Sequence, residues 1–171
     1  ASVQGYVNDP EQLSAAQGLS LQQANLLWLD RYLSVLLPGV LEAFFTEGMV
    51  FEPHLQNVLV SIENYLPAQL WVRDLEGTKL TTERWSASDL AMMSGRARES
   101  VWYSREQGWR RVAYCLLINH LSEVLFRLAD DDQVMEQQLW DLLAAQLGRW
   151  RHQPEIAAIL EGGAIPSKNN L

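Results

Sequence analysis

Two short polar segments carry residue types that could hold a metal ion and a phosphate-bearing substrate. They are His54-Leu-Gln-Asn57 and Arg73-Asp-Leu-Glu-Gly77. Mg²⁺ accepts amide and carboxylate oxygens such as those of Asn57 and Asp74. It usually takes one or two protein groups and completes its shell with substrate phosphates and water. The two segments therefore predict a nucleotide-and-magnesium site, provided that the fold brings them together.

A predicted β-hairpin would bring them together. Runs rich in β-branched and aromatic residues at 58–63 and 68–73, joined by a loop at 64–67, are typical of two antiparallel strands. In this register Asn57 stands opposite Asp74, and opposed residues have Cβ atoms about 4.5–5.5 Å apart. We therefore expect the two side chains to share one metal ion. The alternative is that they only terminate their strands, as Asn and Asp often do.

Helices are predicted on both sides of this hairpin. Ser20, with Gln23 three residues later, forms a capping-box pattern, and apolar residues recur every three or four positions from Leu26 onward. Pro38 predicts a kink in this helix or the start of a second one, because proline has no N–H to donate. Gly48 predicts the end of the helix.

The second half of the chain predicts a helical bundle. We expect helices over about 104–128, 133–150 and 155–160, and the first of them carries a stripe at Val112, Cys115, Asn119, Ser122 and Phe126. The predicted fold class is α+β, with a helical layer, a small antiparallel β-hairpin or sheet over about 49–82, and a C-terminal helical bundle. A third short strand falls near 78–82. Residues 1–18 are interpreted as a flexible lead-in and 19–171 as a single domain.

The composition narrows the class of protein. The chain has 171 residues, 48% apolar and 20% charged, which predicts a folded domain with a hydrophobic core. Its net charge of −8 argues against nucleic acid and anionic membrane surfaces as partners. The single cysteine, Cys115, permits no internal disulfide and no cluster held by four thiolates. No uninterrupted apolar run reaches the roughly 18 residues of a membrane span. We expect no membrane contact and a reducing compartment.

The two polar segments resemble a known family. Phe51-Glu-Pro-His-Leu-Gln-Asn57 and Val72-Arg-Asp-Leu-Glu-Gly77, with a strand pair between them, are similar to the C-terminal, FhuF-like region of the IucA/IucC family of NRPS-independent siderophore synthetases. The helix with Tyr114, Asn119 and His120 resembles the following helix of that family. Gly162-Gly-Ala-Ile-Pro-Ser-Lys168 resembles its late Pro-x-Lys segment. The resemblance covers about residues 20–171.

The resemblance implies an ATP-dependent ligase. Such enzymes adenylate a carboxylate of citrate, a succinyl unit or a related polycarboxylate, and pass the acyl group to an amine, hydroxylamine or alcohol. It implies ATP and Mg²⁺ as cofactors, with Asn57 and Asp74 binding both. It further implies His54 and Asp74 as catalytic residues and His54 beside the activated carboxylate. Lys168 lies in a loop from which it could reach an anionic substrate. A bacterial, cytoplasmic protein is implied.

Family members are several times longer than this chain. We therefore interpret it as a C-terminal fragment whose partner is the missing N-terminal region, and which is inactive alone. The residues leave a homo-oligomer open. Two alternatives remain: an α+β interaction module without chemistry, and a ferric-siderophore reductase. Cys115 argues against the reductase, because an iron–sulfur centre generally needs four ligands, most often thiolates.

Other polar residues have ordinary interpretations. Arg73 is expected to point away from its neighbour Asp74 and to lie on the sheet face or in a salt bridge. Asn119, on the apolar stripe, is expected to be a hydrogen-bonded core residue that supports the site. His120 and His152 are interpreted as ordinary helix residues. Cys115 is expected to be buried and inert.

Overall fold

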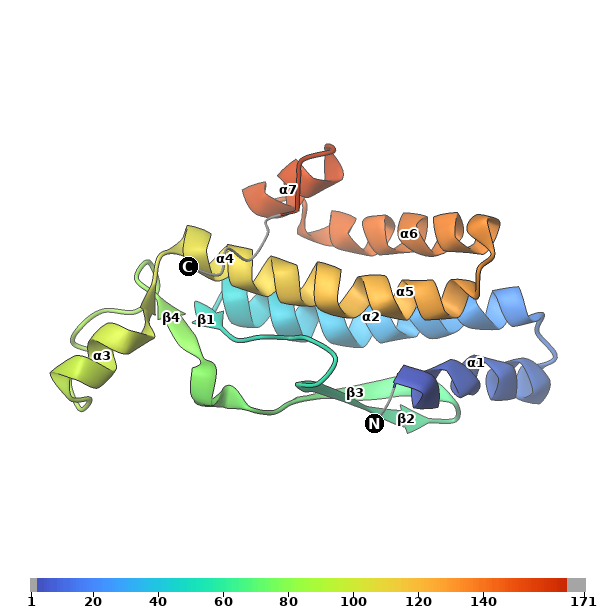
Figure 1. Ribbon diagram of the computed structural model, residues 1–171, viewed down its shortest axis with the longest axis horizontal. Helices are drawn as coiled ribbons and strands as arrows, with labels where there is room; N and C mark the ends of the chain where they lie inside the picture. The colour runs from blue at the N-terminus through green and yellow to red at the C-terminus, as the bar shows by residue number, and fades with distance from the viewer. Residues whose placement is uncertain (1–2, 166–171) are drawn as a thin grey trace.

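The structure is a computed structural model that describes residues 3–165 (Figure 1). Its elements follow one another as α1 (Val3–Gln17), α2 (Leu21–Phe45), β1 (Met49–Val50), β2 (Val58–Glu63), β3 (Leu66–Val72), η1 (Leu75–Gly77), β4 (Lys79–Thr81), α3 (Gly95–Val101), β5 (Trp102–Tyr103), α4 (Arg105–Ala113), η2 (Tyr114–Leu121), α5 (Ser122–Ala129), α6 (Gln133–Leu147), η3 (Gly148–Trp150) and α7 (Pro154–Leu160). The predicted α+β class is confirmed.

The helix α2 is the centre of the fold. The β2–β3 hairpin lies along one side of it, and α6 lies on the other side together with the helix that runs from α4 to α5 (Figure 1). The predicted capping box is present, since the Gln23 N–H donates to the Ser20 hydroxyl and the Ser20 N–H donates to the Gln23 side chain. The helix continues through Pro38 without a break and ends before Gly48, whose φ is +65°.

A second capping box starts the other core helix. The Gln107 N–H donates to the Ser104 hydroxyl, and the helix then runs without interruption through α4, η2 and α5. By length and composition alone, Arg105–Ala129 could cross a membrane, but 61% of its most apolar window is buried inside the fold. That burial is typical of a core helix.

The middle of this helix, η2, is a π-helix, and it changes which side chains are buried. Val112 and Cys115 are buried as predicted, but Asn119 and Phe126 of the same stripe are exposed. The i→i+5 bonding of a π-helix inserts extra residues per turn, so the buried face rotates relative to an α-helical stripe. His120 faces the core instead and is completely buried. The prediction of Asn119 as a core residue is therefore wrong.

The hairpin is present, with a different register from the predicted one. The turn contains only Asn64 and Tyr65, whose φ angles of 51° and 66° suit a two-residue turn of type I′. A bulge follows between Ser61 and Ile62. The shorter turn and the bulge together shift the pairing by one residue from the predicted register.

The remaining strands form a separate small sheet. Its order is β1-β4-β5, with β4 antiparallel to β1 and parallel to β5. The predicted third strand near 78–82 is therefore present as β4, but it does not extend the hairpin. At the N-terminus, residues 3–17 form α1 where a flexible lead-in was expected, and Leu13 of this helix is completely buried.

Candidate functional site

The segment between β1 and β2, residues 51–57, contains His54 and Asn57. It is fixed by a hydrogen bond to the buried His120. Nδ1 of His120 lies 2.7 Å from the Pro53 carbonyl oxygen, and Nε2 lies 2.5 Å from the Tyr32 hydroxyl. A carbonyl can only accept, so Nδ1 carries the proton and Nε2 accepts from the hydroxyl. His120 and Tyr32 are 0% and 1% exposed. The pair thus ties the segment to α2 and η2.

Burial keeps His120 neutral. Burial lowers the pKa of the imidazole from 6.5 to about 4. The nearby charge of His54 lowers it too, whereas the hydrogen bond to Pro53 acts in the opposite direction. A neutral ring is also what the two hydrogen bonds require. The prediction of His120 as an ordinary helix residue is thereby refined, because its ring holds the chain one residue before His54.

Arg73 fixes the other end of the same segment. Its Nε donates to the Gln56 carbonyl at 2.8 Å, and its backbone N–H donates to the Asn57 carbonyl at 2.9 Å. The Asn57 N–H in turn donates to the His54 carbonyl at 2.9 Å, closing a turn. The expectation that Arg73 points away from Asp74 is wrong, because Nε of Arg73 lies 3.7 Å from Oδ2 of Asp74 and the two side chains form an ion pair. Both of these side chains are more than half exposed, so this ion pair contributes little stability.

Asn57 has the features of a ligand-binding residue. It is only 8% exposed, and its side-chain amide makes no hydrogen bond to any residue in the described part of the chain. Buried side-chain polar atoms in proteins nearly always have a partner. The amide is therefore free to bind a group that enters the site.

Asp74 does not stand opposite Asn57, which corrects the predicted register. Arg73 takes that position, as its backbone bond to Asn57 shows. Asp74 is the second residue beyond β3, with φ of +59°, and its side chain is 68% exposed. Arg73 and Asp74 both lie beyond β3, so strand alternation does not set the direction of the Asp74 side chain; the one-residue shift removes only its direct pairing with Asn57. Whether Asn57 and Asp74 serve one metal ion remains a prediction.

Arg111 connects the two polar segments. Its Nε lies 3.0 Å from Oε1 of Glu52, and its Nη1 donates to the Tyr103 hydroxyl at 3.0 Å. Nε2 of His54 lies 4.0 Å from Oε2 of the same Glu52. A Cβ placed on Gly77 would lie 3.7 Å from Nη2 of Arg111. A largely buried guanidinium thus lies between the His54 segment and the end of the Arg73–Gly77 segment.

The described residues could hold a metal ion only with help from a ligand. No group of three or more His, Cys, Asp or Glu residues suited to a metal ion occurs within 3–165. Mg²⁺ needs no such group, because phosphates and water complete its shell around one or two protein oxygens. The free amide of Asn57 and the exposed carboxylate of Asp74 fit that requirement. Lys168, the predicted contact to an anionic substrate, lies outside the described residues.

Sequence reasoning missed Glu52, Tyr103 and Arg111. Glu52 lies in the segment before β2, and its partner Arg111 is 59 positions away in the chain, so no local pattern marks the pair. Nothing in the sequence marked Arg111, because α4 also carries Arg105, Glu106 and Arg110. The other predicted residue on this helix, Cys115, is buried as expected.

Comparison with known proteins identifies the family. Residues 26–171 match the family model described as "Ferric iron reductase FhuF-like transporter". The chain belongs to this FhuF-like family, and its relatives are siderophore synthetases of the IucA/IucC family in which it corresponds to a C-terminal part.

Three relatives illustrate the likeness. An L-2,3-diaminopropanoate–citrate ligase of Staphylococcus aureus is 30% identical over 126 residues, which cover 74% of this chain and 22% of the relative. An N(2)-citryl-N(6)-acetyl-N(6)-hydroxylysine synthase of Escherichia coli is 27% identical and covers 96% of this chain and 29% of the relative. The aerobactin synthetase IucA of Klebsiella pneumoniae superposes with a TM-score of 0.76 at 30% identity over 86% of this chain and 26% of its own. A second structure of IucA, with the same scores, is ATP-bound. The chain thus spans about a quarter of the length of these relatives.

Proposed function

We propose that this chain forms part of the active site of an ATP-dependent siderophore synthetase. The proposed reaction adenylates a carboxylate of citrate, a succinyl unit or a related polycarboxylate, and transfers the acyl group to an amine, hydroxylamine or alcohol. The observation that carries the proposal is the free, nearly buried amide of Asn57, which lies in a rigidly held segment next to His54. A relative that is a citrate ligase and a structural neighbour that is ATP-bound support the substrate and the nucleotide.

Asn57 and Asp74 are proposed to bind ATP together with Mg²⁺. The ion, when bound, would supply positive charge that screens the triphosphate from the incoming carboxylate. Asn57 offers an oxygen from a fixed position, because Arg73 and the turn to His54 hold its backbone. Asp74 offers a charge from the solvent-exposed side of the site, because its side chain is mostly exposed.

His54 and Arg111 are proposed to receive the substrate carboxylate. A guanidinium presents its N–H groups in a planar fork that matches a carboxylate, and here contacts to Glu52 and Tyr103 fix its position. His54, about 4 Å from the same Glu52, would add a second donor beside it. Such preorganised donors stabilise charge that builds up during acyl transfer. Lys168 is proposed as a further contact to the anionic substrate.

The rest of a synthetase is proposed to complete this site. The chain spans about a quarter of its relatives, so we expect the preceding region of a longer protein to supply further cationic groups for the triphosphate and the polycarboxylate. A cytoplasmic location follows from a reaction that consumes ATP. A homo-oligomer is compatible with the proposal but is not needed for it.

The test is carboxylate-dependent exchange of pyrophosphate into ATP. A synthetase that contains this segment should catalyse exchange with citrate or a related polycarboxylate, and the 171-residue chain alone should not. Exchange by neither protein with any polycarboxylate would refute the proposed adenylation and favour a non-catalytic interaction module. Robust exchange by the chain alone would show that the site needs no other region.

The family description favours one second candidate, a ferric-siderophore reductase. An iron–sulfur reductase of this kind would need several thiolates, whereas this sequence has one cysteine, and Cys115 is 1% exposed. Visible absorbance of an iron–sulfur cluster in protein purified without oxygen would favour the reductase. We expect none.

A further inference from the structure

The main chain of His54 is held on both sides. The Pro53 carbonyl belongs to the peptide bond that joins Pro53 to His54, and it accepts a hydrogen bond from Nδ1 of His120 at 2.7 Å. The His54 carbonyl, on the other side, accepts from the Asn57 N–H at 2.9 Å. Because both peptide groups that flank His54 are hydrogen-bonded, the two backbone rotations that set the direction of its side chain are restricted.

The bond to Pro53 comes from a ring that is itself held in the core. The Tyr32 hydroxyl lies 2.5 Å from Nε2 of His120, and both residues are buried. Trp28 stacks on Tyr32, with ring centroids 5.0 Å apart, and is completely buried too. Burying a polar ring costs its hydration, which an aliphatic side chain in the same place would not lose. The two hydrogen bonds offset that cost and give the ring one fixed orientation.

The helix that carries His120 has an unusual geometry at this point. His120 lies in η2, the π-helix of Tyr114–Leu121. A π-helix is rare, and it occurs frequently at functional sites. The neighbouring Asn119 is exposed, whereas His120 is completely buried. The helix geometry is an observation separate from the hydrogen bonds, and both favour a role for His120 beyond filling the core.

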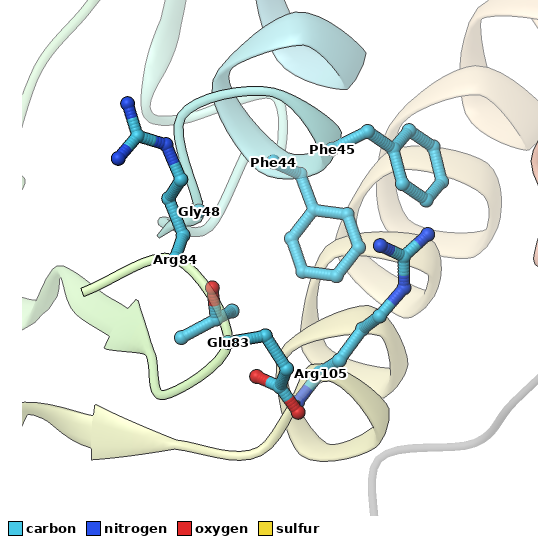
Figure 2. Close-up of a pocket in the computed structure, with 7 residues that line it drawn as sticks. Phe44, Phe45, Gly48, Glu83, Arg84 and Arg105 are labelled. Carbon is cyan, nitrogen blue, oxygen red and sulfur yellow. The ribbon is translucent and has the colours of Figure 1, made fainter. Parts of the chain in front are cut away.

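The cavity beside Gly48 shows the contrasting case, in which charged side chains hold elements of the fold together. The Arg105 guanidinium lies against the Phe45 ring, with Cζ 5.2 Å from the ring centroid (Figure 2). Its Nε also donates to Glu155 at 2.6 Å. These contacts join α4 to α2 and α7. The ring of His120 differs, because its partner is the main chain next to a proposed site residue.

We propose that His120 is a positioning residue that aims the His54 ring at the substrate carboxylate. The inference rests on the proposed function, in which His54 and Arg111 receive that carboxylate. His120 acts through the peptide group between Pro53 and His54, and the Tyr32 hydroxyl keeps its proton on Nδ1. Glu52, whose Oε2 lies 4.0 Å from Nε2 of His54, limits the other end of the side chain.

Two substitutions at His120 separate positioning from packing. In His120→Asn the amide nitrogen can take the place of Nδ1, so a donor for the Pro53 carbonyl is kept. In His120→Gln the amide takes the place of Nε2, so the partner of the Tyr32 hydroxyl is kept and the donor to Pro53 is lost. Both variants lose the packing of the ring. The assay is carboxylate-dependent exchange of pyrophosphate into ATP by a synthetase that contains this segment, with kcat and KM measured for the carboxylate and for ATP.

His120→Gln should lower kcat/KM for the carboxylate at least about tenfold, since a displacement of about 1 Å in an active site can cost about 100-fold. The KM for ATP should change less than about twofold, because Arg73 holds Asn57 separately. His120→Asn should stay within about threefold of the wild type in both. Asn25→Ala is the matched control: it removes a buried side-chain donor to the Leu128 carbonyl, at 2.9 Å, on the helix that also carries Tyr32. It should lower the thermal midpoint and leave both KM values unchanged.

Three kinetic results would overturn the positioning role. They are wild-type kcat/KM in His120→Gln, equal losses in the Asn and Gln variants, and the same loss in Asn25→Ala. The tautomer in the unmodified 171-residue chain, measured by long-range ¹H–¹⁵N NMR, is a check that needs no variant. We expect the proton on Nδ1 at neutral pH; a proton on Nε2 would overturn the proposal even where His120→Gln fails to fold. Absence of exchange in the wild-type synthetase would instead refute the proposed function, so the two failures are distinguishable.

Discussion

Mild acid should destabilise the protein through His120. Its pKa is about 4 in the folded chain and 6.5 as the ordinary value, so the unfolded chain binds a proton first as the pH falls. The stability contributed by this depressed pKa is complete above about pH 6.5 and is lost progressively down to about pH 4. For one group with these two values, the free energy of unfolding falls by about 2 kcal/mol between about pH 7.5 and pH 5.

This pH window separates His120 from the carboxylates. Glu83, Asp89 and Glu155 also have lowered pKa values, but their ordinary values are 4.5, 3.8 and 4.5. The stability that they contribute is present above about pH 4.5 and is lost only as the pH falls further. A loss of stability between about pH 7.5 and pH 5 is therefore assigned mainly to histidine.

The assay is urea unfolding followed by tryptophan fluorescence at both pH values. His120→Gln should remove most of the pH-dependent loss, whereas His152→Gln, which changes an exposed residue, should retain it. NMR titration of the wild-type imidazole gives the same answer without a variant, because the His120 ring should titrate near pH 4 with its proton on Nδ1 at neutral pH. Titration near pH 6.5, or an unchanged loss in His120→Gln, would refute the reasoning.

Three further substitutions test the elements that hold the site. Tyr32→Phe leaves Nε2 of His120 buried without a donor and should lower the free energy of unfolding by about 1–3 kcal/mol, measured by urea unfolding at neutral pH. Ser104→Ala removes the capping hydroxyl that accepts from Gln107 and should cost about 1 kcal/mol in the same assay, with no loss if the cap is not formed in solution. Gly48→Ala forces a Cβ to within 2.5 Å of neighbouring side chains at φ of +65°, so the thermal midpoint should fall by several degrees. A variant as stable as the wild type would contradict the tight packing at Gly48.

Local signals in the sequence predicted the helices well. Ser20 with Gln23 and Ser104 with Gln107 are capping boxes, in which residues three apart satisfy each other, so the start of each helix is encoded in four residues. The strands of the hairpin were equally visible as β-branched and aromatic runs. These features depend on neighbours in the chain and need no knowledge of the rest of the fold.

The hairpin register could not be predicted in the same way. The strand pattern is compatible with a two-residue or a four-residue turn, and only the left-handed conformations of Asn64 and Tyr65 and the bulge at Ser61 decide between them. A shift of one residue sufficed to move Arg73 into the place predicted for Asp74. A register error of one residue leaves the fold prediction unchanged, but it changes which side chain lies opposite Asn57.

The tertiary contacts of the site were beyond sequence reasoning. His120 contacts Pro53 and Tyr32 from η2, which is a π-helix. An α-helical stripe instead predicted that Asn119 is the core residue. The pairing of Arg111 with Glu52 joins residues far apart in the chain. Neither leaves a periodic pattern in the sequence. The residues that resembled family motifs were therefore found, while those that support them were not.

The central claim is that Asp74 and Asn57 serve magnesium and ATP, and one comparison tests it most directly. In a synthetase that contains this segment, the rate of carboxylate-dependent ATP–pyrophosphate exchange is measured against magnesium concentration for the wild type, Asp74→Asn and Asp131→Asn. Asp131 is a matched control, because it is also exposed and has φ of +63°, close to the +59° of Asp74. We predict that Asp74→Asn lowers the exchange rate at least about tenfold and raises the magnesium requirement, with unchanged thermal stability, while Asp131→Asn behaves as the wild type. A wild-type rate and magnesium dependence in Asp74→Asn would contradict the claim.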